Sequence, residues 1–200
     1  MSLQPYLEAN RLEAGCDEVG RGCLAGPVVA AAVILPNHYS NKWINDSKKI
    51  GKKLRKELVE EIKGNAISWH IASSTVEEID KINILNASFL AMSRAILALN
   101  PSPEHLLIDG NRFRSDIHIP YTCVIKGDGK FASIAAASIL AKVYRDDLME
   151  KLAEEFPHYG WERNAGYPTK IHRIGILEHG PCIWHRKTFR LLSDQMNLNL

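Results

Sequence analysis

Four acidic residues have the chemistry of a hard-metal site and stand where short apolar segments end. Asp17 and Glu18 are adjacent, Asp109 follows 92 residues after Asp17, and Asp128 follows 19 residues after Asp109. Strand ends that are far apart in sequence can meet at one edge of a sheet, so we expect these side chains to cluster. Clustered carboxylates repel one another unless cations hold them, and oxygen ligands without His or Cys suit Mg²⁺ or Mn²⁺.

Such a site would support phosphodiester hydrolysis. Two ions about 4 Å apart can activate a water and stabilise the leaving oxygen during in-line attack. The alternative is that each acid only caps a turn or a helix, which is the usual role of an Asp-Gly pair such as Asp109-Gly110. Capping explains the adjacent pair Asp17 and Glu18 less well, because this pair lies in a largely apolar stretch. We therefore favour a two-metal site.

Three further segments carry groups that suit a nucleic-acid backbone. The turn Gly20-Arg21-Gly22 combines accessible N–H groups with a bidentate donor, although many Gly-x-Gly turns are only turns. Ser47 and Lys48 precede a charged segment, where they either contact a phosphate at a helix N-terminus or form a solvated helix start. Tyr167 lies on a tight loop, and its spacing alone favours a packing role.

The histidines and cysteines do not form a second metal site by spacing. None of the four cysteines belongs to a CxxC pair, so neither zinc nor a disulfide framework is indicated. Reduced thiols are typical of a cytoplasmic protein. We interpret His172, His179 and His185 as surface residues or residues outside the first ligand sphere.

The elements that must position these residues alternate along the chain. Apolar segments predict strands over residues 13–18, 27–35, 66–72, 106–109 and 121–125. Amphipathic patterns predict helices over residues 49–63, 85–99, 131–156 and 170–178, and a capping box at Thr75 and Glu78 opens another. Small residues early in the 131–156 helix would let it approach a neighbouring element. Strands that come first and later alternate with helices predict an α/β fold with a mixed sheet.

Length and composition limit the class of protein. A chain of 200 residues with 46% apolar content can bury one main core, with room for a small appendage. Its net charge of +2 is low for a dedicated DNA-binding protein but is compatible with an enzyme whose acidic site binds metal. The sequence has no apolar run long enough for a membrane span and no visible secretory signal.

Several segments, in this order, resemble bacterial ribonuclease HII. The likeness runs from about residue 12 to residue 189, and many ordered matches are far more specific than one. The matching segments are CDEVGRG (16–22), AGPV (25–28), DSKK (46–49), EID (78–80), NI (83–84), IDG (108–110), KGD (126–128), IAAASILAK (134–142), RD (145–146), GYPT (166–169) and HR (185–186).

The resemblance implies a fold and an activity. The expected fold is ribonuclease H-like, a mixed five-stranded sheet flanked by helices with a small helical C-terminal part. It would form one type-2 domain over residues 1–200, with a core at about 12–157 and an appendage at about 158–200. The implied activity is hydrolysis of the RNA strand of RNA–DNA hybrids, including single ribonucleotides embedded in duplex DNA. The implied products carry 3′-hydroxyl and 5′-phosphate ends, which suits a role in ribonucleotide excision repair.

The resemblance also gives roles to individual residues. Asp17, Glu18, Asp109 and Asp128 match the metal-binding catalytic acids, with Mg²⁺ or Mn²⁺ as cofactor. Gly20, Arg21 and Gly22 match the turn that senses the ribose 2′-hydroxyl, the group that distinguishes RNA from DNA. Tyr167 matches the tyrosine that stacks on the sugar after the junction, while Ser47, Lys48 and Lys142 are expected phosphate contacts.

Three alternatives fit the sequence less well. Ribonuclease HIII resembles this family but carries a long N-terminal extension and lacks Arg in the glycine turn, so Arg21 favours ribonuclease HII. A related four-acid exonuclease would need a strand end. A non-catalytic module that binds hybrids would not benefit from four acids that repel phosphate. We expect a monomer whose partner is an RNA–DNA hybrid or a DNA duplex containing ribonucleotides, with no membrane association.

Overall fold

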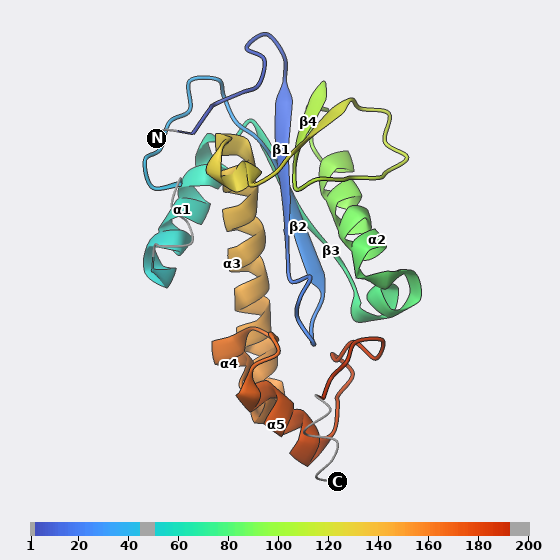
Figure 1. Cartoon of the computed structure of the whole chain (residues 1–200). Coiled ribbons are helices and arrows are strands. Elements are labelled where there is room, and N and C mark those ends of the chain that lie inside the picture. Colours follow the sequence, from blue (N-terminus) through green and yellow to red (C-terminus); the bar gives the residue numbers. More distant parts are fainter. Residues whose placement is uncertain (1–2, 45–50, 193–200) are drawn as a thin grey trace.

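The computed structural model describes residues 3–44 and 51–192, in which five strands form one mixed sheet (Figure 1). The strands are β1 (Glu13–Val19), β2 (Val28–Ile34), β3 (Ser68–Ser74), β4 (His105–Asp109) and β5 (Tyr121–Val124). Their order across the sheet is β3-β2-β1-β4-β5. The pairs β1–β2 and β2–β3 are antiparallel, while β1–β4 and β4–β5 are parallel. The predicted mixed five-stranded α/β fold is confirmed.

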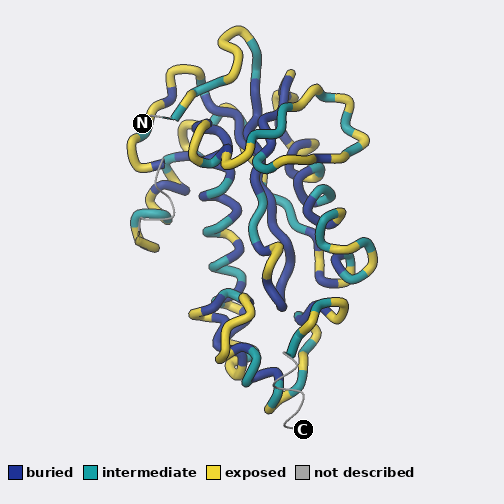
Figure 2. Tube along the Cα trace, in the orientation of Figure 1, coloured by how far each residue is buried: buried dark blue, intermediate teal, exposed yellow. Residues whose placement is uncertain are grey.

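Helices cover both faces of this sheet (Figure 1). The helical elements are α1 (Lys52–Asn65), α2 (Val76–Leu97), η2 (Gly127–Gly129), α3 (Ala132–Glu155), η3 (Pro157–Tyr159), α4 (Trp161–Asn164) and α5 (Lys170–His179). Strand β2 reads VVAAAVI and is buried along its whole length, because its alternate side chains enter two separate cores. Val28 and Ala30 pack on the α2 side, and Val29 and Ala31 pack on the side of α1 and α3. Figure 2 shows the central strands as largely buried.

Helix α3 approaches β1 so closely that only a glycine fits between them. A Cβ on Gly15 would lie 2.2 Å from the backbone carbon of Ser133. The neighbouring positions of α3 are small and buried, among them Ala135, Ala136 and Ala137. The predicted close packing of this helix is therefore confirmed, and it places the middle of α3 beside the end of β1.

Helix α2 joins the two helices that the sequence predicts. The capping box at Thr75 and Glu78 is present, as expected. Asn83 interrupts the helix with φ 66° and ψ 165°, and its Oδ1 accepts hydrogen bonds from the N–H groups of Leu85 and Asn86 at 3.0 and 3.1 Å. Asn83 thus caps the second half, so that the prediction of a separate start near residue 85 has a physical basis.

The C-terminal part packs against the far end of α3. Its apolar cluster is centred on the fully buried Trp161 and includes Tyr159 and Ile176, with Met149 and Leu152 from α3. Loop residues Leu24 and Ala25, which follow the glycine turn, belong to the same cluster. No helix within the described ranges is both long and apolar enough to cross a membrane.

Candidate active site

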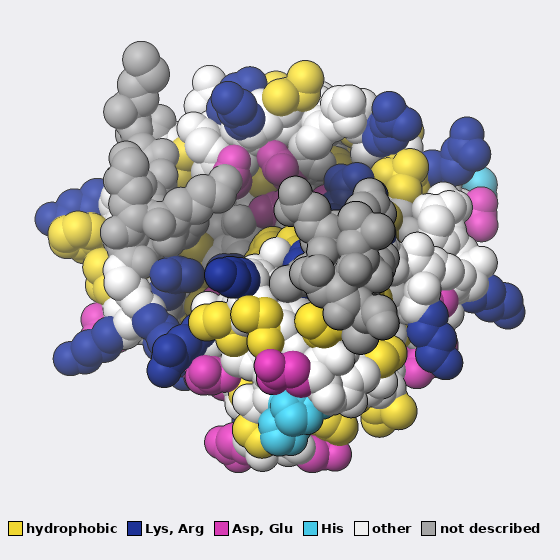
Figure 3. All heavy atoms as spheres, turned by 60° about the horizontal axis from the view of Figure 1, so that its bottom comes forward, with side chains coloured by type: hydrophobic (Ala, Val, Ile, Leu, Met, Phe, Trp, Pro, Cys, Tyr) yellow, Lys and Arg dark blue, Asp and Glu magenta, His cyan; other side chains and the backbone are white. Residues whose placement is uncertain are grey.

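The four predicted acids line one cavity of about 360 Å³. Asp17 and Glu18 lie near the end of β1, Asp109 ends β4, and Asp128 lies in η2 just after β5. Because β1 and β4 are parallel neighbours, their ends reach the same edge of the sheet. Figure 3 shows acidic side chains in a hollow of this face with Lys and Arg side chains around it. The structure thus brings together residues that are far apart in sequence.

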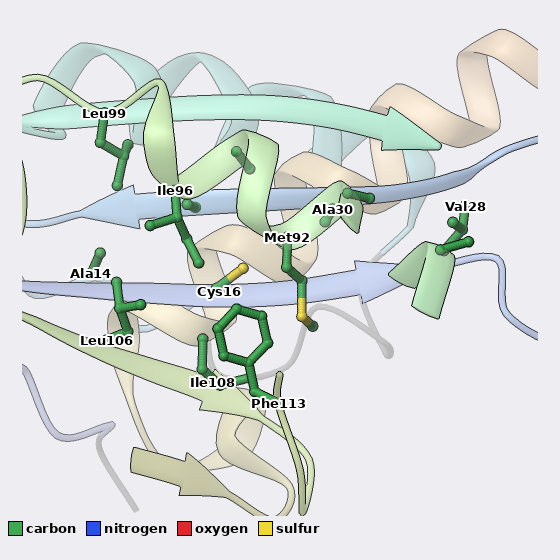
Figure 4. Packing of buried hydrophobic residues seen from close by; sticks show 14 of the residues in the cluster. Ala14, Cys16, Val28, Ala30, Met92, Ile96, Leu99, Leu106, Ile108 and Phe113 are labelled. Carbon is green, nitrogen blue, oxygen red and sulfur yellow. The ribbon is translucent and has the colours of Figure 1, made fainter. Parts of the chain in front are cut away.

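Apolar packing holds the strand ends that carry these acids. Cys16 and Ile108, the residues before Asp17 and Asp109, belong to the buried cluster on the α2 side. Figure 4 shows both side chains close to Phe113 in this core. A displacement of either strand end would therefore disturb the core, which restrains the backbone of the site.

Asp17 and Glu18 point to opposite faces of the sheet, as neighbours on a strand must. The carboxylate of Asp17 accepts a hydrogen bond from the side chain of Ser138 on α3. Glu18 also lines a second cavity of about 230 Å³, which lies against α2 and is shared with Arg21 and Arg112. Asp109 also lines both cavities, so Glu18 and Asp109 are shared between them, whereas Asp17 lines only the first of the two.

Burial and nearby negative charge disfavour the charged form of Asp17 and Glu18. Burial raises the pKa of the Asp17 carboxyl well above its usual range, and the nearby Glu18 and Asp109 raise it further. Burial also raises the pKa of Glu18, against the lowering effect of its hydrogen bond with Arg21. In the protein alone, these acids therefore lack enough positive charge nearby.

Protein donors occupy one oxygen of several acids. Asp17 Oδ1 accepts from the N–H of Glu18 at 2.7 Å, Glu18 Oε1 accepts from Arg21 Nη1 at 3.1 Å, and Asp109 Oδ1 accepts from the N–H of Gly127 at 2.6 Å. Within the described parts of the chain, no three His, Cys, Asp or Glu side chains are arranged to hold a metal ion.

These residues nevertheless fit a hard divalent cation. Their oxygens all come from carboxylates, which Mg²⁺ and Mn²⁺ prefer. A cation would also supply the positive charge that buried Asp17 lacks. Carboxylates that repel one another turn apart and bond to protein donors, and a bound cation would favour rotation of these side chains toward it. This holds most clearly for Glu18, whose present partner Arg21 is half exposed.

Tyr167 and Lys142 line the same cavity as the acids. Lys142 Nζ lies 5.9 Å from the centroid of the Tyr167 ring and 2.7 Å from Asp146 Oδ1. The Tyr167 ring is 38% exposed, so packing alone does not explain this residue. Ser47 and Lys48, the other two expected phosphate contacts, lie outside the described residues.

Sequence reasoning gave no role to several residues at or near this site. Arg55 and Ser138 line the acid cavity, and Arg145 and Arg186 are fully buried behind the glycine turn. Arg145 could have been noticed in the sequence. It stands four residues before Met149, which places a charged residue on the apolar side of α3. The position of Arg186 leaves no such local signal.

Of the two interpretations of the C-terminal histidines, surface residues or residues outside the first ligand sphere, the surface one is wrong for His172 and His185. His172 and His185 are fully buried, with their Nε2 atoms 3.1 Å apart, and Trp161 Nε1 donates to His172 at 2.9 Å. A neutral imidazole that finds hydrogen-bond partners can replace an apolar core residue, which a search for ligand spacing does not detect. His179 is exposed, as expected.

Comparison with known proteins agrees with this geometry. Residues 14–193 match the family model of ribonuclease HII. A relative named ribonuclease HII from Bacteroides thetaiotaomicron is 60% identical over 198 residues, which cover 98% of this chain and 99% of the relative.

Solved structures share the fold. Ribonuclease H2 from Pyrococcus horikoshii gives a TM-score of 0.77 at 22% identity, covering 94% of this chain and 97% of that chain. A ribonuclease HII from Archaeoglobus fulgidus, solved in complex with PCNA, gives 0.73 at 26% identity, covering 91% and 96%. Bst-RNase HIII in complex with Mn²⁺ gives 0.73 at 19% identity, covering 94% and 70%. The chain belongs to the ribonuclease HII family of metal-dependent endonucleases, which cleave the RNA strand of RNA–DNA hybrids.

Proposed function

We propose that this enzyme cleaves at ribonucleotides in duplex DNA, including single embedded ones, and leaves 3′-hydroxyl and 5′-phosphate ends. The observation that carries the proposal is the shared cavity. Acids from three separate segments line it together with Tyr167 and Lys142, and the Gly20–Gly22 turn directly follows the strand that bears Asp17 and Glu18.

The four acids would hold Mg²⁺ or Mn²⁺. Asp17, which is the most buried of the four, and Asp109, whose charge it senses, would be the central ligands, and Glu18 and Asp128 would complete the set. Bound divalent cations activate a water and offset negative charge on the phosphate and on the leaving oxygen. The Mn²⁺ complex of the related Bst-RNase HIII supports a divalent cofactor.

The residues of the chain orient this site without the metal. The side chain of Ser138 on α3 would bond to Asp17 and lower the pKa of its carboxyl. The N–H of Gly127 holds Asp109 and links it to the turn that carries Asp128. The carboxylate oxygens that these bonds do not use remain available to hard cations in the cavity.

Substrate recognition would rest on Tyr167 and Lys142, which line the acid cavity, and on the Gly20–Gly22 turn. Gly20, Arg21 and Gly22 would contact the ribose at its 2′-hydroxyl, and the exposed face of Tyr167 would stack on the next sugar. Lys142 offers a cation for a neighbouring phosphate, at the cost of its ion pair with Asp146.

A closed-circular DNA duplex with one ribonucleotide tests this function. We expect one nick in Mg²⁺ or Mn²⁺, none in EDTA, and none in the same circle without the ribonucleotide. An exonuclease would leave the circle intact because it needs a strand end, and a binding module would retard it without cutting. Either result would refute the proposal.

We also propose a cytoplasmic monomer built as one domain, with residues 158–200 as the C-terminal appendage. All four cysteines are unpaired, which supports a reducing compartment. The apolar cluster around Trp161 draws residues from α3, from the loop after the glycine turn and from the C-terminal part, which supports a single folding unit. Sedimentation and limited proteolysis would test the oligomeric state and the domain assignment.

A further inference from the structure

Two arginines, Arg145 and Arg186, are fully buried without a carboxylate partner among the described residues. Among residues 3–44 and 51–192, their guanidinium groups donate only to main-chain carbonyl oxygens. A buried cation is costly and needs compensating hydrogen bonds. Six of these seven bonds end on one loop, residues 20–27, which indicates that the two arginines do more than fill the core.

Arg186 holds the glycine turn from its inner side. It donates to the carbonyl oxygens of Gly20 at 2.7 Å, Arg21 at 3.0 Å and Gly26 at 3.0 and 2.9 Å. A trans peptide directs its C=O and N–H groups in opposite directions. Since the carbonyls of Gly20 and Arg21 face Arg186, the N–H groups of Arg21 and Gly22 face away from it.

These outward N–H groups form a small concave donor site. Neither one donates to a backbone carbonyl within the part of the chain that the structure describes. Successive N–H groups that point the same way are suited to an oxygen with lone pairs or negative charge. The buried guanidinium behind them favours the same kind of ligand.

Arg145 connects this turn to the segment that bears Tyr167. It donates to Ala25 and Pro27 on one side, at 2.9 and 3.0 Å, and to Ala165 on the other, at 2.7 Å. The two segments touch directly as well, because the N–H of Leu24 donates to the carbonyl of Gly166 at 2.8 Å.

Glycines make this arrangement possible at both contact points. A Cβ on Gly20 would lie 2.3 Å from Arg145 Nε, and a Cβ on Gly166 would lie 2.6 Å from the carbonyl oxygen of Ala25. Both glycines have positive φ, at +96° and +82°. The arginines, the turn and the Tyr167 loop are therefore fitted to one another.

Helix α2 fixes the segment that carries Arg186. Asp80 accepts hydrogen bonds from the N–H groups of Lys187 and Thr188, both at 3.0 Å, and from the Thr188 hydroxyl at 2.7 Å. Arg186 is thus anchored from outside the turn and does not simply follow it.

We propose that Arg186 and Arg145 are positioning residues for ribose recognition. Arg186 turns the N–H groups of Arg21 and Gly22 toward the substrate, and Arg145 sets the distance between this turn and Tyr167. The inference rests on the proposed function of the turn and extends it to two residues that do not touch the substrate.

The test is a ratio of two dissociation constants for the full chain, measured by fluorescence anisotropy in EDTA, in which a metal-dependent enzyme does not cut. One duplex carries a single internal ribonucleotide and the other is the same duplex in DNA only. The folded fraction of a preparation cancels in this ratio, so a merely structural defect does not change it. Lys keeps the charge of Arg but lacks its rigid fork of donors. We expect Arg186→Lys to reduce the preference for the ribonucleotide about tenfold, or about 1.4 kcal/mol, with a smaller loss in Arg145→Lys.

Arg173→Lys is the matched control. Arg173 also donates to main-chain carbonyls of the C-terminal segment, those of Arg190 and Leu191, which lie outside the turn. We expect the Arg173→Lys variant to prefer the ribonucleotide-containing duplex as strongly as the wild type does. An equal loss in this control, or a preference within twofold of the wild type in both Arg186→Lys and Arg145→Lys, would overturn the inference.

Gly22→Ala separates this inference from the function on which it rests. A Cβ on Gly22 meets no atom within 4 Å, so the new methyl group stands on the open side of the turn. If Gly22→Ala lowers the preference while the arginine variants do not, the turn senses ribose and the arginines do not position it. If Gly22→Ala changes nothing, the proposed sensing role of the turn is itself wrong.

Discussion

The acid cavity and the buried arginine pair adjoin the same glycine turn and treat charge in opposite ways. The acids are crowded, and burial together with mutual repulsion raises the pKa values of Asp17 and Glu18. The guanidinium groups of Arg145 and Arg186 are more deeply buried, yet main-chain carbonyls satisfy them. Burial lowers the pKa of Arg186 to about 10, but this region has its own hydrogen-bond acceptors, whereas the acid cavity lacks positive charge that a cation could supply.

This difference matches the tasks of the two regions. A metal site needs carboxylates that bind a cation more strongly than they bind the protein, so internal compensation there would weaken it. A recognition turn needs a fixed shape before the substrate arrives, because ordering it on binding would cost affinity. Substitutions should therefore lower activity in the first region and lower stability in the second.

The largest expected effect is on catalysis and comes from Asp109→Asn. The Asn Oδ1 can still accept from the N–H of Gly127, so the turn that carries Asp128 should stay in place. Loss of a charged ligand should lower kcat on a single-ribonucleotide duplex by at least about a thousandfold, or about 4 kcal/mol. Thermal unfolding of the same sample serves as the control for folding. Activity within tenfold of the wild type would show that Asp109 is not a metal ligand.

Gly20→Ala should cause the largest loss of stability. The new Cβ would meet Arg145 Nε at 2.3 Å in a backbone conformation with φ +96°. We expect a loss of about 2 to 4 kcal/mol, seen as a Tm lower by about 5 to 15 °C. Gly22→Ala in the same turn is the matched control, and its stability should change by less than about 1 kcal/mol. Equal Tm values would mean that Arg145 does not brace the turn.

The buried histidines and the acid cavity should contribute to the pH dependence of stability with opposite sign. Burial, together with the neighbouring His172, lowers the pKa of His185 to about 4. Between pH 4 and 6.5 the unfolded chain binds this proton and the folded chain does not, so stability falls as the pH drops below 6.5.

Comparison with His185→Gln isolates that effect. Between pH 7 and pH 5 the wild type should lose about 2 kcal/mol more stability than the variant, measured by urea unfolding. Taking the difference between the two proteins cancels titration in the acid cavity. A variant with the same pH dependence as the wild type would show that His185 does not titrate in this way.

Lys142→Gln should give the smallest effect. If Lys142 contacts one phosphate, its loss should weaken binding of every duplex by a similar factor and reduce the salt slope of log K by about 0.9. Binding isotherms from 50 to 200 mM salt would measure both quantities. An unchanged salt slope would show that Lys142 does not contact a phosphate and only forms its ion pair with Asp146.

Local patterns in the sequence predict most of the fold. Alternation and apolar runs give all five strands to within two residues, and the capping box at Thr75 is correct. The short helical elements η2, η3 and α4 were not predicted, because three or four residues carry no periodic signal. Asn83 is the one residue of α2 with non-helical backbone angles, so residues 76–97 can be described either as one kinked helix or as two helices.

The site was predictable where chemistry shows in single residues and unpredictable where it depends on long-range contacts. Asp17, Glu18, Asp109 and Asp128 do line one cavity, and so do Tyr167 and Lys142. The opposite orientation of Asp17 and Glu18 follows from strand geometry alone. The role of Arg186 depends on carbonyl oxygens about 160 residues earlier in the chain, and no local pattern encodes such a contact.

The most direct test of the contrast between the two regions is the Tm of wild type and Asp17→Asn, each in EDTA and in Mg²⁺. A carboxyl whose pKa is raised in the folded state destabilises the fold above that group's unfolded pKa, so neutral Asn should relieve this effect. We predict that Asp17→Asn is inactive, unfolds about 2 to 4 °C higher than wild type in EDTA, and gains less than wild type from Mg²⁺. A variant that is less stable than wild type in EDTA, or that retains cleavage, would contradict the account.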